Sequence, residues 1–421
     1  MLALTGGTPV RQKRFPSWPI HDESDAQAVA DVIRSGIWGL GGRNISEFEK
    51  RFAAYQDAPY GVVTCNGTVS LLLALIALGV GPGDEVLIPA YTFIATASSV
   101  LQAGAVPVMV DIDPDTYCMD PEAAEAAITP RTACIVPVHV AGHPADLDRL
   151  GEIAKRHKLA LLEDAAQAHG AQWKGRGVGS YGDLGTFSFQ ASKNLASGEG
   201  GMIVSCNELL ANMCLAYRNC GRWEGGSGAR RVLGYNLRMT EMQAALLLSQ
   251  MKRLDEQTRL RNENGIYLAE KLSEIEGIRP LKRDERTTRH AYHLFVFRFD
   301  ASVWGIPLNV FLEALSAEGI PCSRGYLPLY RDPAFIPFGQ SCPAAWEGIG
   351  DQLARVDYQQ LFLSVTEKAS SEAVWLTQSI LLGTKEDMDD IVTAVAKLWE
   401  GREQLVGRRS RRGMGYAGLS D

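Results

Sequence analysis

Short apolar runs alternate with helix-like segments through the first half of this chain. The runs are continuous in their apolar positions and cover residues 85–88, 106–111, 133–138, 159–163, 185–189 and 202–205. Segments with helical spacing lie between them, at residues 68–78, 92–102, 121–127 and 146–156. Continuous apolar strands separated by helices predict a parallel or mixed sheet that is covered on both faces. Ligands of such sheets bind beyond the carboxyl ends of the strands, where we expect Asp164 and His139 to lie.

The pattern changes after residue 240. Apolar residues then recur at i, i+4 and i+7, first at Leu247, Met251 and Leu254, and again at Leu268, Leu272 and Ile275. This spacing predicts one long amphipathic helix, or two in series with a break at Gly265. Beyond it, residues 290–299 alternate as a strand does, and residues 308–317 and 388–399 look helical. These elements predict a smaller α+β domain.

We therefore expect two domains and a tail, which fits the length of 421 residues. Residues 1–250 are assigned to a large α/β domain with a mixed, mostly parallel sheet, and residues 251–400 to the smaller domain. Residues 401–421 carry a basic run among glycines and are expected to form a disordered tail. We also expect a mobile loop at the Gly-rich residues 221–228 and an irregular surface insertion at residues 337–351.

Composition narrows the class of protein. Apolar residues make up 46% and charged residues 22% of the chain, which is ordinary for a soluble globular enzyme. The formal net charge of -7 argues against nucleic acid as the main partner, because phosphate binding favours a basic face.

Cysteines and apolar runs bear on metals, membranes and compartment. Eight cysteines occur without a Cys-x-x-Cys pair, so neither a zinc site nor a disulfide framework is expected. No apolar run reaches the roughly 20 residues of a membrane-spanning helix, and the N-terminus is too short and weakly apolar for a secretory signal. The cytoplasm is therefore the expected compartment.

The most informative stretch for chemistry is residues 188–201. Its single lysine, Lys193, lies between the apolar run 185–189 and a glycine cluster that leads into the next run. A lysine held between two buried strands is kept from bulk water, and a desolvated amine is a nucleophile toward aldehydes. Asp164 ends another buried run. Such a pair is what pyridoxal phosphate requires, because the lysine forms the Schiff base and the acid keeps the pyridine nitrogen protonated.

Three motifs make a family resemblance specific: Glu163-Asp164-Ala165-Ala166-Gln167, Phe187-Ser188-Phe189-Gln190 followed by Lys193-Asn194, and Gly198-Glu199-Gly200-Gly201. With them, the sequence resembles the DegT/DnrJ/EryC1/StrS family of sugar and cyclitol aminotransferases, within the fold-type I pyridoxal-phosphate enzymes. The resemblance runs from about Gly6 to about Trp399. It implies an aminotransferase in which Lys193 and Asp164 are catalytic and two subunits share their active sites.

The resemblance also implies ligands for the cofactor's phosphate. Gly67 and Thr68 stand at the start of the helix predicted at 68–78, where free N–H groups suit an anion. The alternative is a plain helix cap. Ser188 matches a position that gives its hydroxyl to the same phosphate. Asn236 matches one that reaches the phosphate in the neighbouring subunit, and its alternative is an Asx-type turn before the helix.

Two further positions match residues that contact the cofactor's ring. Phe93 matches the aromatic residue that stacks on the ring, although most phenylalanines are ordinary core residues. Gln167 matches the residue that hydrogen-bonds the phenolic oxygen. His139 and His169 are given no catalytic role, because a lone histidine near a site is more often structural.

The sequence departs from many sugar aminotransferases in the smaller domain, where those enzymes have a histidine before an aromatic residue. Here the segment reads Arg324-Gly325-Tyr326-Leu327-Pro328. That version looks more like the cyclitol aminotransferases and the 3-amino-5-hydroxybenzoate synthases, as do the opening residues 6–11 and the segment 36–39. The resemblance therefore implies transfer of an amino group from glutamine or glutamate to a keto sugar or a keto-cyclitol such as scyllo-inosose.

Two alternatives stay open. An aromatising dehydration, as in 3-amino-5-hydroxybenzoate synthase, uses the same lysine, and no residue separates it from transamination. A non-catalytic regulator that binds the cofactor is the second alternative. Some twenty-five residues precede the first helical segment, which is too few for a helix-turn-helix module. The presence of Lys193 and Asp164 also favours catalysis.

Overall fold

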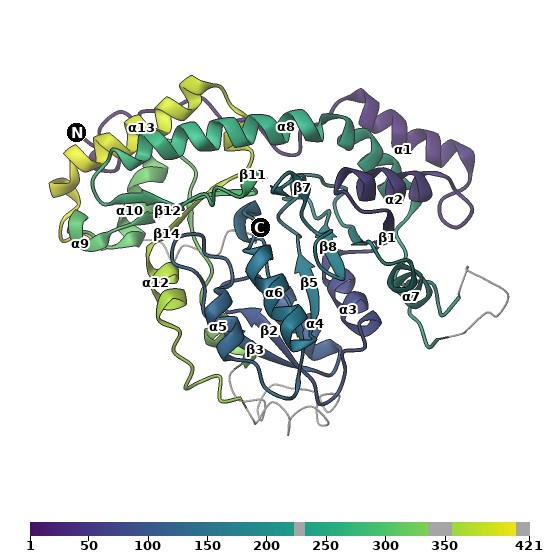
Figure 1. Ribbon diagram of the computed structural model, residues 1–421. Helices are drawn as coiled ribbons and strands as arrows, with labels where there is room; N and C mark the ends of the chain where they lie inside the picture. The colour runs from purple at the N-terminus through teal and green to yellow at the C-terminus, as the bar shows by residue number, and fades with distance from the viewer. Residues whose placement is uncertain (223–231, 336–355, 410–421) are drawn as a thin grey trace.

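A seven-stranded sheet forms the centre of the larger part of the molecule (Figure 1). The computed structural model describes residues 1–222, 232–335 and 356–409. The strands, in spatial order, are β1 (Tyr60–Thr64), β9 (Gly201–Ser205), β8 (Leu184–Ser188), β5 (Ala160–Asp164), β4 (Thr132–Ile135), β2 (Glu85–Pro89) and β3 (Val106–Val110). Strand β9 is antiparallel to both of its neighbours, and the pairs from β8 to β3 are parallel. The sheet is mixed and mostly parallel, as the sequence predicts.

All six apolar runs of the sequence form strands of this sheet, but two details differ. Strand β4 ends at Ile135, three residues before the predicted end, and Val138 makes only an isolated bridge to Asp164. Pro137 lies in that stretch and has no N–H to donate to a ladder. Strand β1 was not predicted, because its sequence Tyr-Gly-Val-Val-Thr gives a short apolar run interrupted by glycine.

Helices cover both faces of the sheet. One face packs against α3 (Gly67–Ala77), α4 (Ile94–Gln102) and α7 (Glu208–Arg218). The other face packs against α2 (Asn44–Tyr55), α5 (Pro121–Ala126) and α6 (Leu147–His157). The strands carry fully buried apolar side chains beneath both helix layers, so the sheet is the middle of three layers.

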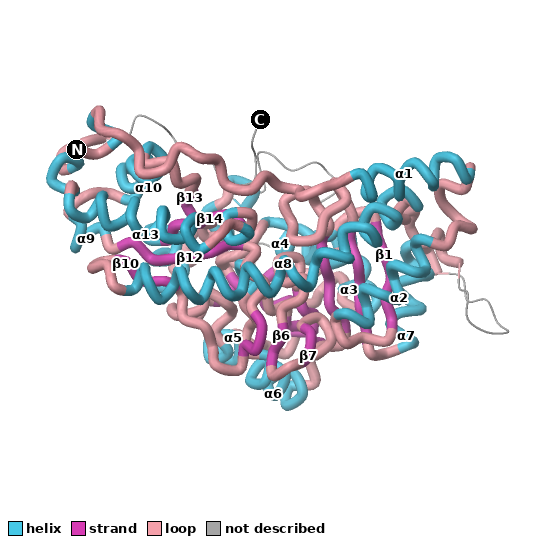
Figure 2. Tube along the Cα trace, turned by 90° about the horizontal axis from the view of Figure 1, so that it is seen from above, coloured by secondary structure: helices cyan, strands magenta, loops and turns pink. Residues whose placement is uncertain are grey.

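Helix α8 (Glu241–Ser273) is continuous and joins the two parts of the molecule (Figure 2). It begins with a capping box, in which the Thr240 side chain accepts from Gln243 N and the Gln243 side chain accepts from Thr240 N. Of the two alternatives that the sequence left open, the single long helix is therefore present, and there is no break at Gly265. This glycine packs flat against the ring of Tyr292, where an added Cβ would lie 2.5 Å from a ring carbon. Close packing therefore explains the glycine.

The smaller part is built on an antiparallel sheet. Its strands, in spatial order, are β10 (Ile278–Pro280), β12 (Leu294–Phe299), β14 (Ala373–Thr377) and β13 (Ser323–Arg324). Its helices are α9 (Ala301–Trp304), α10 (Leu308–Ala317), α12 (Ser364–Glu372) and α13 (Lys385–Glu400). The predicted helices 308–317 and 388–399 are thus present. The predicted strand 290–299 begins only at Leu294, because residues 290–293 bond to other segments.

The two ends of the chain differ from the sequence's assignment. Leu2 is fully buried in the core of the smaller part, although the N-terminal segment was assigned with the rest of residues 1–250 to the large domain. Residues 402–405 form a 3-10 helix whose Leu405 is also buried in that core, so the tail predicted as disordered from residue 401 does not begin there. Residues 410–421, the insertion predicted at 337–351 and most of the loop predicted at 221–228 lie outside the described residues.

Helix α1 (Glu23–Ser35) packs along α8.

None of the helices in residues 1–222, 232–335 and 356–409 is long and apolar enough to cross a membrane.

Candidate active site

The loop that carries Lys193 connects β8 to β9, and we call residues 189–200 the lysine loop. Backbone bonds close it tightly. Lys193 N donates to Gln190 O at 2.8 Å, Ala191 N to Gly198 O at 2.9 Å, and Ser197 N to Phe189 O at 2.9 Å. The lysine is therefore held in a compact turn.

Asn194 ties the lysine loop to residues 291–293 of the chain. Its Nδ2 donates to Ala291 O at 2.8 Å, and His293 Nδ1 donates to its Oδ1 at 3.2 Å. Asn194 is buried, so both bonds are shielded from water. Burial and the nearby positive charge of Lys193 hold the pKa of His293 well below its usual value, which keeps this histidine neutral. Two segments that are distant in the sequence are thus fixed together beside the lysine.

Lys193 itself has an unusually acidic ammonium group. Burial lowers the pKa of Lys193 to about 8, although the charges of Asp164 and Glu199 act in the opposite direction. A free lysine has a pKa about two units higher, so a much larger fraction of Lys193 is neutral at physiological pH. A neutral amine is the form that attacks an aldehyde.

Asp164 stands at the carboxyl end of β5, beside the lysine loop. Its Oδ2 accepts a hydrogen bond from the hydroxyl of Thr96 at 2.9 Å, and its Oδ1 accepts from Ala166 N at 3.2 Å. Burial raises the pKa of Asp164 above its usual value, against these bonds and the charge of Lys193. A cation placed beside this carboxylate would lower its pKa again.

The neighbouring Glu163 points into the core and fixes the end of β5. Its carboxylate accepts from His139 Nε2 at 3.0 Å and from the backbone N–H groups of Gly179, Tyr181 and Gly182 at 2.7 Å each. Burial alone would raise the pKa of Glu163, but these donors hold it below its usual value. His139 is therefore a structural partner of Glu163, as expected for a lone histidine.

His169 follows β5 in the chain and is also buried. Its Nε2 donates to Ser188 O at 2.8 Å, and phenylalanines 52, 187 and 189 surround its ring. Burial lowers the pKa of His169 to about 3, helped by the charge of Lys193. The ring stays neutral at physiological pH, and its bond supports the strand end that carries Ser188.

Gly67, Thr68 and Ser188 come together at the start of α3. Asn66 caps this helix, with its side chain accepting from Val69 N at 3.0 Å. A Cβ on Gly67 would lie 2.7 Å from Ser188 Cβ, so only glycine fits against this serine. The helix cap is thus present and is made by Asn66, and it leaves the amides of Gly67 and Thr68 without a partner within the helix, beside Ser188.

Phe93 is not an ordinary core residue. Its side chain is 56% exposed, and it is the N-cap of α4. Gln167, three residues after Asp164, is buried and uses both ends of its amide. Its Oε1 accepts from Ala141 N at 2.7 Å, and its Nε2 donates to the Tyr326 hydroxyl at 2.9 Å.

Asn236 lies apart from these residues. It is exposed, and its backbone pairs with Asn219 just before α8. This backbone bridge joins Asn236 to the end of α7. Exposed apolar side chains occur near the same helix start, where Trp38 O accepts from Glu241 N. They include Trp38, Leu40 and Tyr235.

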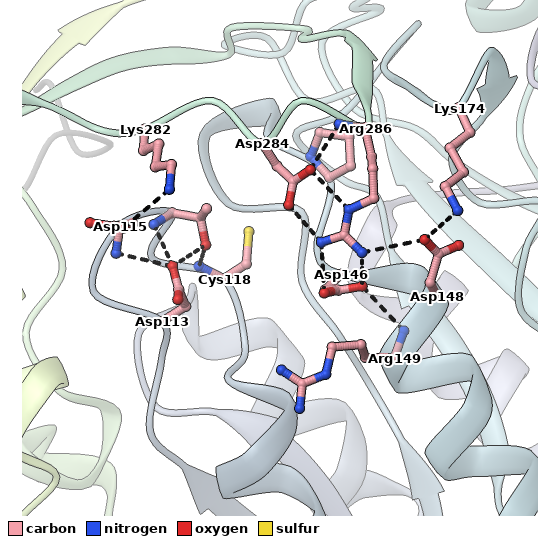
Figure 3. A network of polar contacts seen from close by, with 12 residues as sticks. Asp113, Asp115, Cys118, Asp146, Asp148, Arg149, Lys174, Lys282, Asp284 and Arg286 are labelled. Carbon is pink, nitrogen blue, oxygen red and sulfur yellow. Dashed lines mark hydrogen bonds and ion pairs between the residues drawn. The ribbon is translucent and has the colours of Figure 1, made fainter.

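A network of ion pairs supports the segment that clamps Asn194 (Figure 3). Strand β11 (Thr287–Arg289) pairs with β6 (Gln172–Trp173), which pairs with β7 (Arg176–Gly177). Just before β11, the guanidinium of Arg286 bonds both oxygens of Asp146, at 3.0 and 2.8 Å, and both oxygens of Asp284, at 3.0 and 2.7 Å. This network joins residues 284–286 to the start of α6. Residues 291–293, which follow β11, contact the lysine loop.

Sequence reasoning missed four polar residues of this site: Thr96, Asn194, Tyr326 and His293. Asn194 and Tyr326 lie in the motifs that carry the family resemblance, which was the available signal. Thr96 and His293 are ordinary positions in a helix and a loop. Only the tertiary contacts bring them to the site.

The model of the DegT/DnrJ/EryC1/StrS aminotransferase family matches residues 19–396. The chain belongs to this family. It is an aminotransferase with the fold of the fold-type I pyridoxal-phosphate enzymes.

Two relatives are similar over nearly their whole length. A protein of Streptoalloteichus tenebrarius, provisionally named an L-glutamine:3-amino-2,3-dideoxy-scyllo-inosose aminotransferase, is 46% identical over 409 residues, with 94% of this chain and 97% of that protein covered. The L-glutamine:2-deoxy-scyllo-inosose aminotransferase of the same organism is 40% identical over 422 residues, with 96% and 99% covered.

Two crystal structures are similar in fold. The structure of 3-amino-5-hydroxybenzoic acid synthase has a TM-score of 0.82 and 35% identity to this chain. The match covers 94% of this chain and 100% of the synthase chain. The Bacillus subtilis protein NtdA, solved with the cofactor PMP bound, has a TM-score of 0.75 and 29% identity, with 90% and 82% covered. PMP is the amine form of pyridoxal phosphate, the cofactor of this aminotransferase.

The residues present fit that cofactor. Asp164 is a buried carboxylate whose raised pKa a protonated ring nitrogen would lower again. Gly67 leaves no Cβ between the first amides of α3 and the Ser188 hydroxyl, which suits a phosphate.

Proposed function

We propose that this protein transfers the amino group of L-glutamine to a keto-cyclitol of the scyllo-inosose type, in aminocyclitol biosynthesis. The observation that carries the proposal is the environment of Lys193. This lysine lies in a compact loop beside Asp164, and burial lowers the pKa of Lys193 to about 8. The acceptor and donor are supported by the relatives that are 40–46% identical, both named for glutamine and an inosose.

We assign the site residues the following roles in holding the cofactor. Lys193 binds the cofactor's aldehyde, and Asp164 holds the ring nitrogen in its protonated form. The amides of Gly67 and Thr68 and the Ser188 hydroxyl bind the phosphate. Phe93 stacks on the ring, and Gln167 donates to its phenolic oxygen.

When bound, pyridoxal phosphate supplies an electron sink that stabilises a carbanion on the substrate. The chain's own contribution is the placement and movement of protons. The Nζ of Lys193, once free, would act as the base for the proton of the donor's α-carbon. The same atom would act as the acid for the carbon of the acceptor that receives the amino group. A pKa near 8 suits both directions, because both protonation states are populated near neutral pH.

We further propose a homodimer with shared active sites. Asn236 is exposed and lies among exposed apolar side chains at the start of α8, where it would reach the phosphate in the partner's site. We also propose that the chain divides into two domains along α8 near residue 250. The compartment we propose is the cytoplasm, because the cysteines of the described residues are free thiols.

The direct test is incubation of the holoenzyme with L-glutamine and 2-deoxy-scyllo-inosose. We expect an aminocyclitol, detected by mass spectrometry, with the amino nitrogen of ¹⁵N-labelled glutamine incorporated. Loss of water without nitrogen transfer would instead support the aromatising dehydration. The 3-amino-5-hydroxybenzoic acid synthase structure, at 35% identity, makes this reaction the second candidate. A protein that does neither reaction would contradict the proposed function.

A further inference from the structure

Tyr326, from the smaller part of the molecule, contacts the candidate cofactor site through Gln167. The two residues are separated by 159 positions in the sequence, and the Gln167 Nε2 to Tyr326 hydroxyl distance is 2.9 Å. Gln167 belongs to the turn after β5, three residues from Asp164. Tyr326 follows β13 in the segment where this sequence departs from many sugar aminotransferases.

The orientation of the Gln167 amide follows from its other neighbour. Ala141 N lies 2.7 Å from Oε1 and is a backbone N–H, which can only donate. The oxygen must therefore face Ala141, and the nitrogen must face Tyr326. One N–H of that nitrogen goes to the Tyr326 hydroxyl, and its second N–H has no acceptor among the described residues. That second N–H is the group available to the cofactor's phenolic oxygen.

Packing makes Tyr326 a rigid acceptor for this bond. Its ring meets Trp375 edge-on, with centroids 4.6 Å apart, and Tyr91 at 5.5 Å. Gly325 allows this arrangement, because a Cβ there would lie 1.9 Å from the Tyr91 hydroxyl and 2.9 Å from the indole nitrogen of Trp375. Gly325, which stands where many sugar aminotransferases have a histidine, thus makes room for an aromatic cluster that fixes Tyr326.

From these contacts we infer that Tyr326 is a positioning residue for the cofactor, which acts by holding the Gln167 amide so that its free N–H meets the phenolic oxygen. The inference rests on the proposed function of Lys193 and Gln167. It also links the two parts of the molecule, because a residue of the smaller part then sets the electronic state of a group bound to the larger part.

The test is the pH titration of the bound cofactor's absorbance in the Tyr326→Phe holoenzyme. Donation from Gln167 stabilises negative charge on the phenolic oxygen. With weaker donation, that oxygen holds the neighbouring proton more strongly, so the midpoint moves to higher pH. We expect a rise of roughly one unit, the size that loss of a hydrogen bond to a charged group gives. The kcat should fall while the KM for glutamine changes little.

Tyr91→Phe is the matched control. The Tyr91 ring packs against Tyr326, and its buried hydroxyl makes no hydrogen bond to Gln167 or to the Tyr326 hydroxyl in the described residues. Its removal leaves Gln167 untouched, so its midpoint should equal that of the wild type. Equal midpoints in Tyr326→Phe, Tyr91→Phe and the wild type would overturn the inference. A shift of the same size in both variants would also overturn it, because the effect would then come from packing.

A double variant separates positioning from an independent effect of the phenol. In the Gln167→Met background, Tyr326→Phe should add no further shift, and additive shifts would overturn the inference. If circular dichroism shows that Tyr326→Phe does not fold, Gln167→Met alone must raise the midpoint. An unchanged midpoint in Gln167→Met would then overturn the inference. A wild-type protein without an absorbing cofactor on Lys193 would instead refute the proposed function.

Discussion

At the scale of single residues, the protonation state of the Lys193 amine governs capture of the cofactor. Because burial lowers its pKa to about 8, its neutral fraction grows as the pH rises through that value. The rate of pyridoxal phosphate binding to the apoprotein should therefore rise about tenfold per unit below pH 8 and level off above it. Stopped-flow absorbance at a series of pH values measures this profile. A rate that continues to rise to pH 10 would contradict the lowered pKa.

Asp164 and Glu163 are adjacent carboxylates with different roles. Asp164→Asn keeps the shape but removes the charge that holds the ring nitrogen protonated, so we expect kcat to fall roughly 100-fold or more with folding little changed. Steady-state kinetics at saturating cofactor measures the loss.

The matched control is Glu163→Gln. Glu163 accepts four hydrogen bonds inside the core, so this variant should lower the free energy of unfolding and leave kcat of the folded protein nearly unchanged. A normal kcat in Asp164→Asn would show that Asp164 is not the partner of the ring.

At the scale of elements, the lysine loop depends on a clamp from residues 291–293. Asn194→Ala removes the bonds to Ala291 O and from His293, so the free energy of unfolding should fall by about 1–3 kcal/mol. Capture of pyridoxal phosphate should also slow by about tenfold or more, because the amine is less well oriented.

Asn264→Ala tests whether that slowing is specific. Asn264 is a buried asparagine of α8 whose Nδ2 donates to Leu381 O and Gly383 O at 2.9 Å each. Its loss should cost similar stability, measured by urea unfolding, without slowing capture. If both variants slow capture equally, the clamp on Asn194 has no particular role.

The elements themselves could largely be predicted from local patterns. Continuous apolar runs identify buried parallel strands, and all six runs belong to the central sheet. The pattern failed where tertiary contacts decide the conformation. Gly265 accommodates the ring of Tyr292 inside a continuous helix, and Ala291 and His293 bond to Asn194 of the lysine loop in place of a strand ladder.

At the scale of the whole molecule, contacts between distant segments were beyond sequence reasoning. Lys193, Asp164, Gly67 and Ser188 could be identified because each lies in a recognisable motif. The partners that tune them come from far along the chain, such as Tyr326 for Gln167, and nothing in the local sequence marks such a pair. The position of Leu2 in the core of the smaller part is another such contact.

Assembly gives a prediction of its own. If Asn236 completes the partner's site, a Lys193→Ala subunit and an Asn236→Ala subunit should complement each other when mixed and reassociated. Random pairing of two inactive parents gives half mixed dimers, each with one intact site, so about a quarter of wild-type activity should return. Analytical ultracentrifugation would establish the dimer in parallel. A fully active monomer would contradict the shared site.

The central claim is that Lys193 carries the cofactor, and trapping that bond tests it most directly. The holoenzyme is reduced with borohydride, digested, and mapped by mass spectrometry for the mass of the reduced cofactor. The account predicts the label on Lys193 in the wild type, and in Lys193→Ala it predicts cofactor that binds without a covalent link. A label on any other lysine would contradict it.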